Sequence, residues 1–177
     1  MGSMKIMAPK NMATGSLLHV GCGSDPLPDW LHGFTETRLD INPNANPDIV
    51  ASMLDMGDIG TFDVILCRHA LEHLYSHEVT VALEEFKRVL NNGGHLIVFV
   101  PDLQDVQATN EVLFMSPSGP ITGLDLIYGF REAITTNPHM QHKTGFIKDI
   151  LEKSLDGFGE VVVKRLGNYD LMGVGIK

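Results

Sequence analysis

One stretch of the chain decides its fold: Leu17-Leu18-His19-Val20-Gly21-Cys22-Gly23-Ser24. A short apolar run ends abruptly there in Gly-x-Gly, which predicts a buried parallel strand over about 16–21 that breaks into a loop. Glycine lacks a Cβ atom and tolerates positive φ, so a backbone built from it can come very close to a ligand. The stretch therefore predicts a ligand-binding loop at the end of the first strand.

A second strand-like run supports this interpretation because it ends in an acidic residue: Thr37-Arg38-Leu39-Asp40-Ile41. A glycine-rich turn after one strand and an acid after the next are typical of α/β sheets that bind a nucleotide or nucleoside through its ribose hydroxyls. The dinucleotide motif adds a third glycine that opens a helix, whereas this chain continues with Ser24-Asp25-Pro26. We therefore expect a nucleoside without phosphates, and a nicotinamide-dependent oxidoreductase is disfavoured.

The composition predicts one globular domain without polyanionic or membrane partners. The 177 residues are 44% hydrophobic and 20% charged, which suits a single domain with its own core. A net charge of -9 argues against nucleic acid and anionic membrane surfaces as partners. The sequence has neither a long apolar run nor an apolar leader. Two cysteines, Cys22 and Cys67, are too few for a disulfide framework, so we expect a cytoplasmic protein.

Alternating strand and helix patterns predict a doubly wound α/β fold with a mostly parallel sheet. Further strand-like runs span about 36–41, 48–51, 62–67, 95–100, 160–165 and 169–176. An apolar stripe at helical spacing predicts a helix over 76–90 capped by Ser76, and Thr144 is the predicted cap of a helix to 155. The last two runs form a hairpin that places an antiparallel strand in the sheet. Residues 101–143 are interpreted as an insertion after the fifth strand, which covers the strand ends as a lid.

Four motifs over residues 15–101 resemble, in order and spacing, the class I S-adenosylmethionine-dependent methyltransferases, close to the methyltransferase type 11 group. They are Leu18-His19-Val20-Gly21-Cys22-Gly23, Leu39-Asp40-Ile41, Phe62-Asp63-Val64-Ile65-Leu66-Cys67-Arg68-His69-Ala70-Leu71-Glu72-His73-Leu74 and Arg88-Val89-Leu90-Asn91-Asn92-Gly93-Gly94-His95-Leu96. The resemblance implies a Rossmann-like sheet of seven strands, one methyltransferase-like domain over 1–177, and S-adenosyl-L-methionine as cofactor. Pro26 and Pro28 depart from the family because they shorten the helix that usually follows the glycine loop.

The resemblance also implies where the cofactor binds. The glycine loop would face its methionine end, Asp40 would bind the ribose hydroxyls, and Ile41 would pack on the adenine. The turn after the third strand would meet the adenine edge, and the end of the fourth strand would lie beside the reactive methyl group. The cofactor-binding residues implied in this way are Gly21, Cys22, Gly23, Asp40, Ile41, Ser52, Met53 and Arg68.

Methyl transfer to an oxygen or nitrogen can use a base that removes the proton of the nucleophile. By position, the candidates are His69 after the fourth strand, Asp102 after the fifth strand, and His142 in the predicted lid. His69, His73 and His77 recur every four residues, but neither a cysteine nor a carboxylate completes a ligand set with them. The sequence therefore predicts no metal site.

The predicted function is S-adenosylmethionine-dependent methyl transfer to a small-molecule or carbohydrate-like acceptor. Two alternatives remain open. A catalytically silent binding domain on the same fold would bind the cofactor poorly or transfer no methyl group. A nicotinamide-dependent oxidoreductase would bind the dinucleotide and would not bind S-adenosylhomocysteine.

Overall fold

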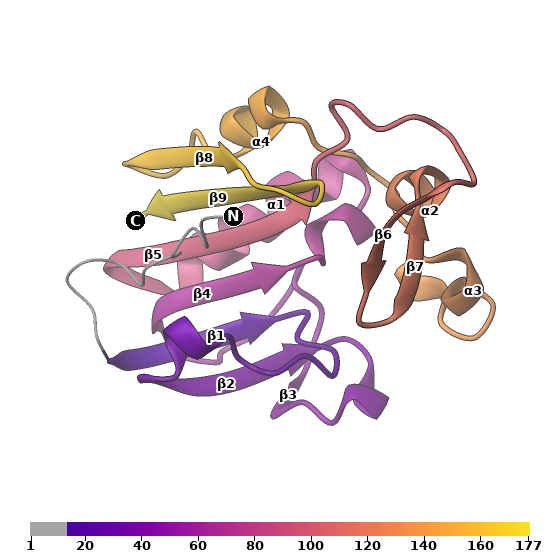
Figure 1. Cartoon of the computed structure of the whole chain (residues 1–177). Helices are drawn as coiled ribbons and strands as arrows, with labels where there is room; N and C mark the ends of the chain where they lie inside the picture. Colours follow the sequence, from indigo (N-terminus) through magenta and orange to yellow (C-terminus); the bar gives the residue numbers. More distant parts are fainter. Residues whose placement is uncertain (1–13) are drawn as a thin grey trace.

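A computed structural model describes residues 14–177, and its centre is a seven-stranded sheet with the order β3-β2-β1-β4-β5-β9-β8 (Figure 1). The strands are β1 (Gly15–Val20), β2 (Phe34–Asp40), β3 (Ile49–Val50), β4 (Phe62–Arg68), β5 (Leu90–Pro101), β8 (Val161–Arg165) and β9 (Asp170–Ile176). β1 to β5 pair in parallel, and β9 lies antiparallel between β5 and β8. This confirms the predicted α/β class, the seven strands and the antiparallel C-terminal strand. Residues 1–13 of the predicted domain lie outside the described residues.

Both faces of the sheet are covered by apolar cores. Successive side chains on a strand point to opposite faces, so one strand contributes to both cores. On β4, Ile65 and Cys67 point into the larger core, whereas Val64 and Leu66 point into the smaller one. The larger core is covered by α1 (Ser76–Val89) and α4 (Lys148–Ser154). The stripe that α1 buries consists of Val79, Ala82, Leu83, Phe86 and Val89. The smaller core is closed by η1 (Asp29–Leu31), whose Leu31 is fully buried.

The junction between α1 and β5 differs from the prediction at both ends of the helix. Ser76 is the first residue of α1 rather than its cap. Tyr75 is the N-cap, and its backbone N–H donates to Glu78 Oε2 at 2.8 Å. At the other end, α1 passes directly into β5, whose first residue, Leu90, pairs with Phe62 of β4. Pairing with a neighbouring strand therefore begins several residues before the predicted start of the fifth strand.

The helix predicted after Thr144 begins later, at Lys148. The intervening residues are extended, because Phe146 pairs with Asp102 beside the end of β5. Thr144 is therefore not the cap of α4. Among residues 14–177, no helix combines the length and the apolar character needed to cross a lipid bilayer.

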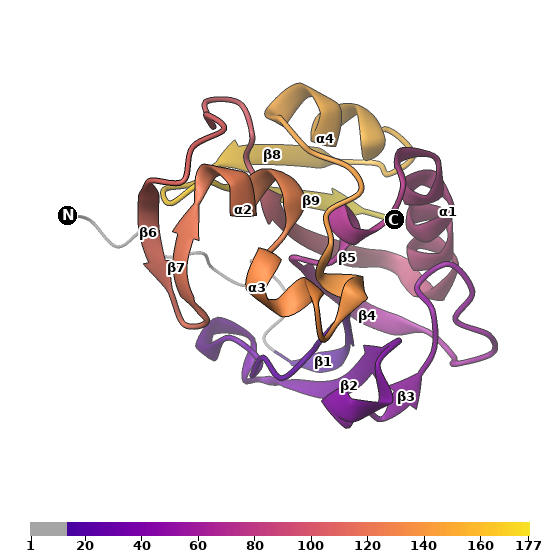
Figure 2. The same ribbon diagram turned by 90° about the vertical axis from the view of Figure 1, so that its right-hand side faces the viewer.

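Residues 102–143 form a small unit that lies across the carboxyl ends of the parallel strands (Figures 1 and 2). Its elements are β6 (Val112–Ser116), β7 (Gly119–Thr122), α2 (Gly123–Tyr128), α3 (Arg131–Ile134) and η4 (Pro138–Met140). The antiparallel pairing of β6 with β7 was not predicted, because Pro117, Gly119 and Pro120 favour turns.

Contacts at both ends hold this unit against the sheet. Near its start, the ring of Phe114 stacks on Tyr169 with 6.1 Å between ring centroids. At its end, the backbone N–H of Lys143 donates to the carbonyl oxygen of Glu72 at 2.8 Å. Glu72 belongs to η3 (Leu71–His73), the short helix that follows β4. The unit is thereby fixed beside the ends of β4 and β9.

Candidate functional site

The two glycines of the loop after β1 have different structural roles. Gly21 has φ +64°, and a Cβ atom at this position would lie 2.5 Å from Cβ of Ala70. Gly23 has φ +48°, and a Cβ atom there would meet nothing within 4 Å. Gly21 therefore permits a close approach to the chain after β4, whereas Gly23 faces open space. Between them, Cys22 is 1% exposed, and burial raises the pKa of its thiol.

Asp40 ends β2 directly beside this loop. Its Oδ2 accepts from the backbone N–H of Gly23 at 2.8 Å, and its Oδ1 accepts from the N–H of Asn42 at 2.8 Å. A carboxylate has about four acceptor positions, so both oxygens can accept further hydrogen bonds. The next residue, Ile41, leaves 50% of its surface exposed although it is large and apolar. The predicted ribose-binding and adenine-binding residues therefore lie together at the open side of the loop.

Arg38 holds the loop in place and was not predicted as a site residue. Its guanidinium donates to the carbonyl oxygens of Gly23 and Asp25, at 2.8 and 2.9 Å. The same group pairs with Glu36 Oε1 at 3.1 Å. Glu36, Arg38 and Asp40 alternate along β2 and share one face, so the two-residue period of a strand is the sequence signal that points to Arg38.

Glu36 also pairs with a buried histidine of β1. His19 is 1% exposed, and its Nδ1 lies 2.8 Å from Glu36 Oε1. Burial lowers the pKa of His19, and the hydrogen bond to Glu36 opposes this only in part. The imidazole is therefore held neutral beneath the loop that Arg38 anchors.

This burial predicts a stability change with pH that depends on His19. The pKa of His19 is lower in the folded chain than in the unfolded chain, where it is about 6.5. The contribution of His19 to the free energy of unfolding is therefore present above pH about 6.5, and it is lost as the pH falls through the folded pKa. We expect His19→Gln, which can still donate to Glu36, to lose less stability than the wild type between pH about 7.5 and about 5. Urea unfolding at both pH values measures this difference.

The matched control is His32→Gln, because the side chain of His32 is 61% exposed. This variant should show the pH dependence of the wild type. An unchanged pH dependence in His19→Gln would contradict the assignment of the effect to His19.

The turn after β3 comes close to the glycine loop. The backbone N–H of Ala51 donates to the carbonyl oxygen of Asp40 at 3.1 Å, which places the following turn beside the end of β2. Cε of Met53 lies 3.9 Å from the position of a Cβ atom on Gly21. The hydroxyl oxygen of Ser52 accepts from the N–H of Leu54 at 3.2 Å, which leaves its proton for another acceptor.

His69 lies in a strained position at the end of β4. Its φ is +48°, a conformation that few residues other than glycine adopt. Its Nδ1 is 3.6 Å from Glu72 Oε1, its Nε2 is 3.7 Å from Asp170 Oδ1, and 40% of the side chain is exposed. Burial lowers the pKa of His69, but the two carboxylates outweigh it, so that the pKa is raised overall. The neighbouring Arg68 instead lies over the ring of Phe99, 5.8 Å from its centroid.

The other two predicted bases are held by hydrogen bonds to neighbouring groups. Asp102 is 3% exposed, and its Oδ2 accepts from Arg165 Nε while its Oδ1 accepts from the N–H of Gln104. His142 donates from Nδ1 to the carbonyl oxygen of Leu126 at 2.9 Å. The structure therefore brings His69 and Asp170 to the exposed end of β4, and it pairs the buried Asp102 with the exposed Arg165.

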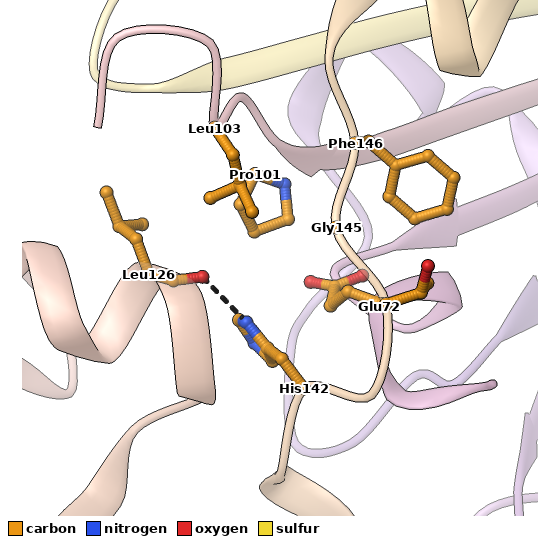
Figure 3. Close-up of a pocket in the computed structure, with 8 residues that line it drawn as sticks. Glu72, Pro101, Leu103, Leu126, His142, Gly145 and Phe146 are labelled. Carbon is orange, nitrogen blue, oxygen red and sulfur yellow. Dashed lines mark hydrogen bonds between the residues drawn. The ribbon is translucent and has the colours of Figure 1, made fainter. Parts of the chain in front are cut away.

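A small pocket lies beneath the unit that crosses the strand ends (Figure 3). Its lining residues are Glu72, Pro101, Leu103, Leu126, His142, Thr144, Gly145 and Phe146. Glu72 is 1% exposed, yet the pKa of its carboxyl is lowered. Burial alone would raise this pKa, and the hydrogen bond and charge of His69, followed by the charges of His73 and His142, outweigh that effect. The sequence reasoning missed both Glu72 and Asp170, although Glu72 lies within one of the quoted motifs.

The sequence of the central part of the chain matches a known family. Residues 18–98 match the family model described as a methyltransferase domain. The matched segment contains the last three residues of β1, all of β2 to β4, α1 and the larger part of β5, together with the glycine loop, Asp40 and His69. Comparison with curated protein sequences gives no match.

Solved structures with low sequence identity share the fold over most of this chain. The PH0226 protein from Pyrococcus horikoshii OT3 has a TM-score of 0.65 at 17% identity, covering 93% of this chain and 82% of its own. An S-adenosylmethionine-dependent methyltransferase from Clostridium acetobutylicum ATCC 824 has a TM-score of 0.61 at 11% identity, covering 94% and 84%. The N-methyltransferase NodS from Bradyrhizobium japonicum WM9, solved with S-adenosyl-L-homocysteine, has a TM-score of 0.58 at 14% identity, covering 93% and 79%.

Proposed function

We propose that this chain transfers the methyl group of S-adenosyl-L-methionine to a small-molecule or carbohydrate-like acceptor, because residues 18–98 match the methyltransferase family model and the chain shares its fold with a solved S-adenosylmethionine-dependent methyltransferase. The strongest support is the geometry at the ends of β1 and β2. Gly23 faces open space, and Asp40 beside it retains free acceptor positions. Ile41 exposes an apolar surface next to them. An adenosine group fits these three features.

The chain's own residues would bind and orient the cofactor, which supplies a methyl group already activated on a sulfonium centre. The backbone around Gly21, Cys22 and Gly23 would hold its methionine end. Asp40 would accept from both ribose hydroxyls, and Ile41 and Met53 would pack against the adenine. Ser52 would bond to the adenine edge, and Arg68 would lie near the reacting end. Positioning of this kind supplies much of the rate of a displacement between two bound groups.

We propose His69 as the base among the three predicted candidates. Its imidazole is the most exposed of the three, and its two carboxylate neighbours make it a stronger base than an ordinary histidine. Asp102 is occupied by Arg165, and His142 is buried more deeply in the pocket wall. Base roles for Asp102 and His142 stay predictions, and a variant at either position should affect transfer less than His69→Ala.

A hydroxyl-rich acceptor is supported by the acidic surroundings of His69. The side chain of Asp170 is 34% exposed beside it, and carboxylates accept hydrogen bonds from hydroxyl groups. The net charge of -9 supports a neutral or cationic small molecule over a polyanion. We also place the chain in the cytoplasm, because its two cysteines are free and buried, as suits a reducing compartment.

The two alternative functions make different predictions about ligands. A dinucleotide needs a helix N-terminus for its pyrophosphate. Within the described part of the chain, the glycine loop is instead followed by irregular residues and the three-residue η1. A silent domain would bind the cofactor weakly or transfer nothing.

Calorimetric titration with S-adenosylhomocysteine and with NAD⁺ tests the proposal. We expect 1:1 micromolar binding of S-adenosylhomocysteine, of the order of -8 kcal/mol, and no heat with NAD⁺. Incubation with labelled S-adenosylmethionine and a panel of polyols and amines then tests transfer. Binding without transfer to any acceptor would favour the silent domain, and binding of NAD⁺ alone would favour the oxidoreductase.

Replacing Arg38 with alanine is expected to weaken S-adenosylhomocysteine binding by about tenfold. The change removes the hydrogen bonds to the carbonyl oxygens of Gly23 and Asp25, each worth about 1 kcal/mol, and so loosens the loop. Calorimetric titration measures the dissociation constant. Lys164→Ala removes an exposed cation from the far edge of the sheet and should leave it unchanged. Equal effects of both changes would show that Arg38 acts only through net charge.

A further inference from the structure

Glu72, His73 and His142 meet where η3 packs against the end of the unit formed by residues 102–143. Each of the three offers one potential ligand atom, and these atoms all lie within 4.8 Å of one another. The rings of His73 and His142 meet edge to face, with 5.1 Å between their centroids. The two parts of the chain that supply this cluster are far apart in sequence and adjacent only in the fold.

Both imidazoles are oriented by a contact between Nδ1 and a backbone carbonyl oxygen. Nδ1 of His73 lies 3.1 Å from the carbonyl oxygen of Gln141, and Nδ1 of His142 lies 2.9 Å from that of Leu126. A carbonyl oxygen can only accept, so each Nδ1 carries a proton, and in a neutral imidazole the lone pair is then on Nε2. A hydrogen bond from Nδ1 to a backbone carbonyl is the contact that orients histidine ligands in metal sites.

The carboxylate of Glu72 has one oxygen without a partner. Its Oε1 lies 3.6 Å from His69 Nδ1, whereas its Oε2 is buried and has no hydrogen-bond partner among the described residues. A buried carboxylate oxygen without a partner is costly, so a cation beside it would stabilise the fold. In Figure 3, the carboxylate of Glu72 and the ring of His142 border the same pocket.

We propose that Glu72, His73 and His142 bind a divalent transition-metal ion, with Zn²⁺ the best fit. Two imidazole nitrogens, one carboxylate oxygen and a water form a frequent four-coordinate zinc set. Tetrahedral bonds of about 2.0–2.1 Å place ligand atoms about 3.4 Å apart, so the present spacing of up to 4.8 Å closes by up to about 1.4 Å. Rotation of the two partly exposed imidazoles supplies this movement. Mg²⁺ and Ca²⁺ fit less well because they prefer oxygen ligands.

A metal ion here would fasten the 102–143 unit to the end of β4. The backbone already joins them, because the N–H groups of Lys143 and Thr144 both donate to the carbonyl oxygen of Glu72. The ion would add bonds from side chains on both parts of the chain. Because the ion binds the folded chain, its binding free energy adds to the stability of this arrangement.

Calorimetric titration of the full chain with zinc chloride, after treatment with a chelator, tests the site. We expect one ion per chain and a rise in Tm of the wild type with zinc. His73→Ala and His142→Ala should each weaken zinc binding by more than about 100-fold, because removing a ligand costs at least as much as removing its supporting partner. His77→Ala and His139→Ala, which change exposed histidines nearby, should bind within about twofold of the wild type.

Circular dichroism without zinc shows whether each variant is folded. Glu72→Gln changes the third ligand, and the glutamine side chain has nearly the same shape as the glutamate side chain. The proposal is wrong if the folded wild type does not bind zinc, or if His139→Ala weakens binding as much as His142→Ala. The zinc site does not depend on the proposed methyl transfer. Titration with S-adenosylhomocysteine in the absence of zinc tests the methyltransferase proposal separately, so failure of either proposal can be recognised.

Discussion

Asp40→Ala is expected to weaken S-adenosylhomocysteine binding by more than about 100-fold, because two hydrogen bonds from ribose hydroxyls to a charged group are worth roughly 1.5–3 kcal/mol each. The change also removes the acceptor for the N–H of Gly23, so the loop loses a support at the same time. Calorimetric titration of wild type and variant measures the ratio of dissociation constants. Asp40→Asn keeps one acceptor oxygen without the charge and should fall between the two.

Asp25→Ala is the matched control for this prediction. Asp25 is exposed in the same loop, and its carboxylate accepts no hydrogen bond from the residues that the structure describes. Its backbone contacts survive the change, so the affinity should stay within about twofold of the wild type. If Asp40→Ala bound as tightly as Asp25→Ala, the ribose role of Asp40 would be refuted. A wild type that does not bind S-adenosylhomocysteine would instead support the silent-domain alternative.

Gly21→Ala is expected to lower the free energy of unfolding by about 3 kcal/mol. A left-handed conformation costs an L-residue roughly 1–2 kcal/mol, and forcing a methyl group into a packed site costs about 1–3 kcal/mol more. At Gly21 both costs apply, because φ is +64° and the new Cβ would lie 2.5 Å from Cβ of Ala70. Urea unfolding of both proteins measures the difference.

Gly57→Ala separates the two costs. Gly57 has φ +68°, and a Cβ atom there meets nothing within 4 Å, so only the conformational cost of about 1 kcal/mol remains. The double variant Gly21→Ala with Ala70→Gly should recover part of the loss, because the facing methyl group is gone. Equal losses in Gly21→Ala and Gly57→Ala would show that the contact with Ala70 is unimportant.

The sheet and helix α1 can be predicted from sequence because their signals are local. The apolar run over 62–67 and the apolar stripe of α1 indicate which residues are buried, and neither pattern depends on knowing the partner in the fold. The beginning of α4 cannot be found in this way. Thr144 is a good capping residue, but the pairing of Phe146 with Asp102 keeps the chain extended beyond it. Tertiary pairing here overrides a local preference.

The cofactor side of the candidate site is predictable for a related reason. Gly21 and Asp40 end neighbouring parallel strands, and such strands bring their carboxyl ends to one edge of the sheet. The cluster of Glu72 and His142 has no such signal. These residues meet only because the intervening chain folds back, and no periodicity in either segment encodes that contact.

The two edges of the sheet also determine how this protein resists aggregation. At one edge, β3 consists of two residues, so it presents little free backbone to a strand from another molecule. At the other edge, β8 carries the exposed charges of Lys164 and Arg165, which oppose docking of a further strand. The seven-stranded sheet therefore offers a poor template for pairing with another molecule. In unfolded molecules, by contrast, the apolar 62–67 segment is free to pair with other chains.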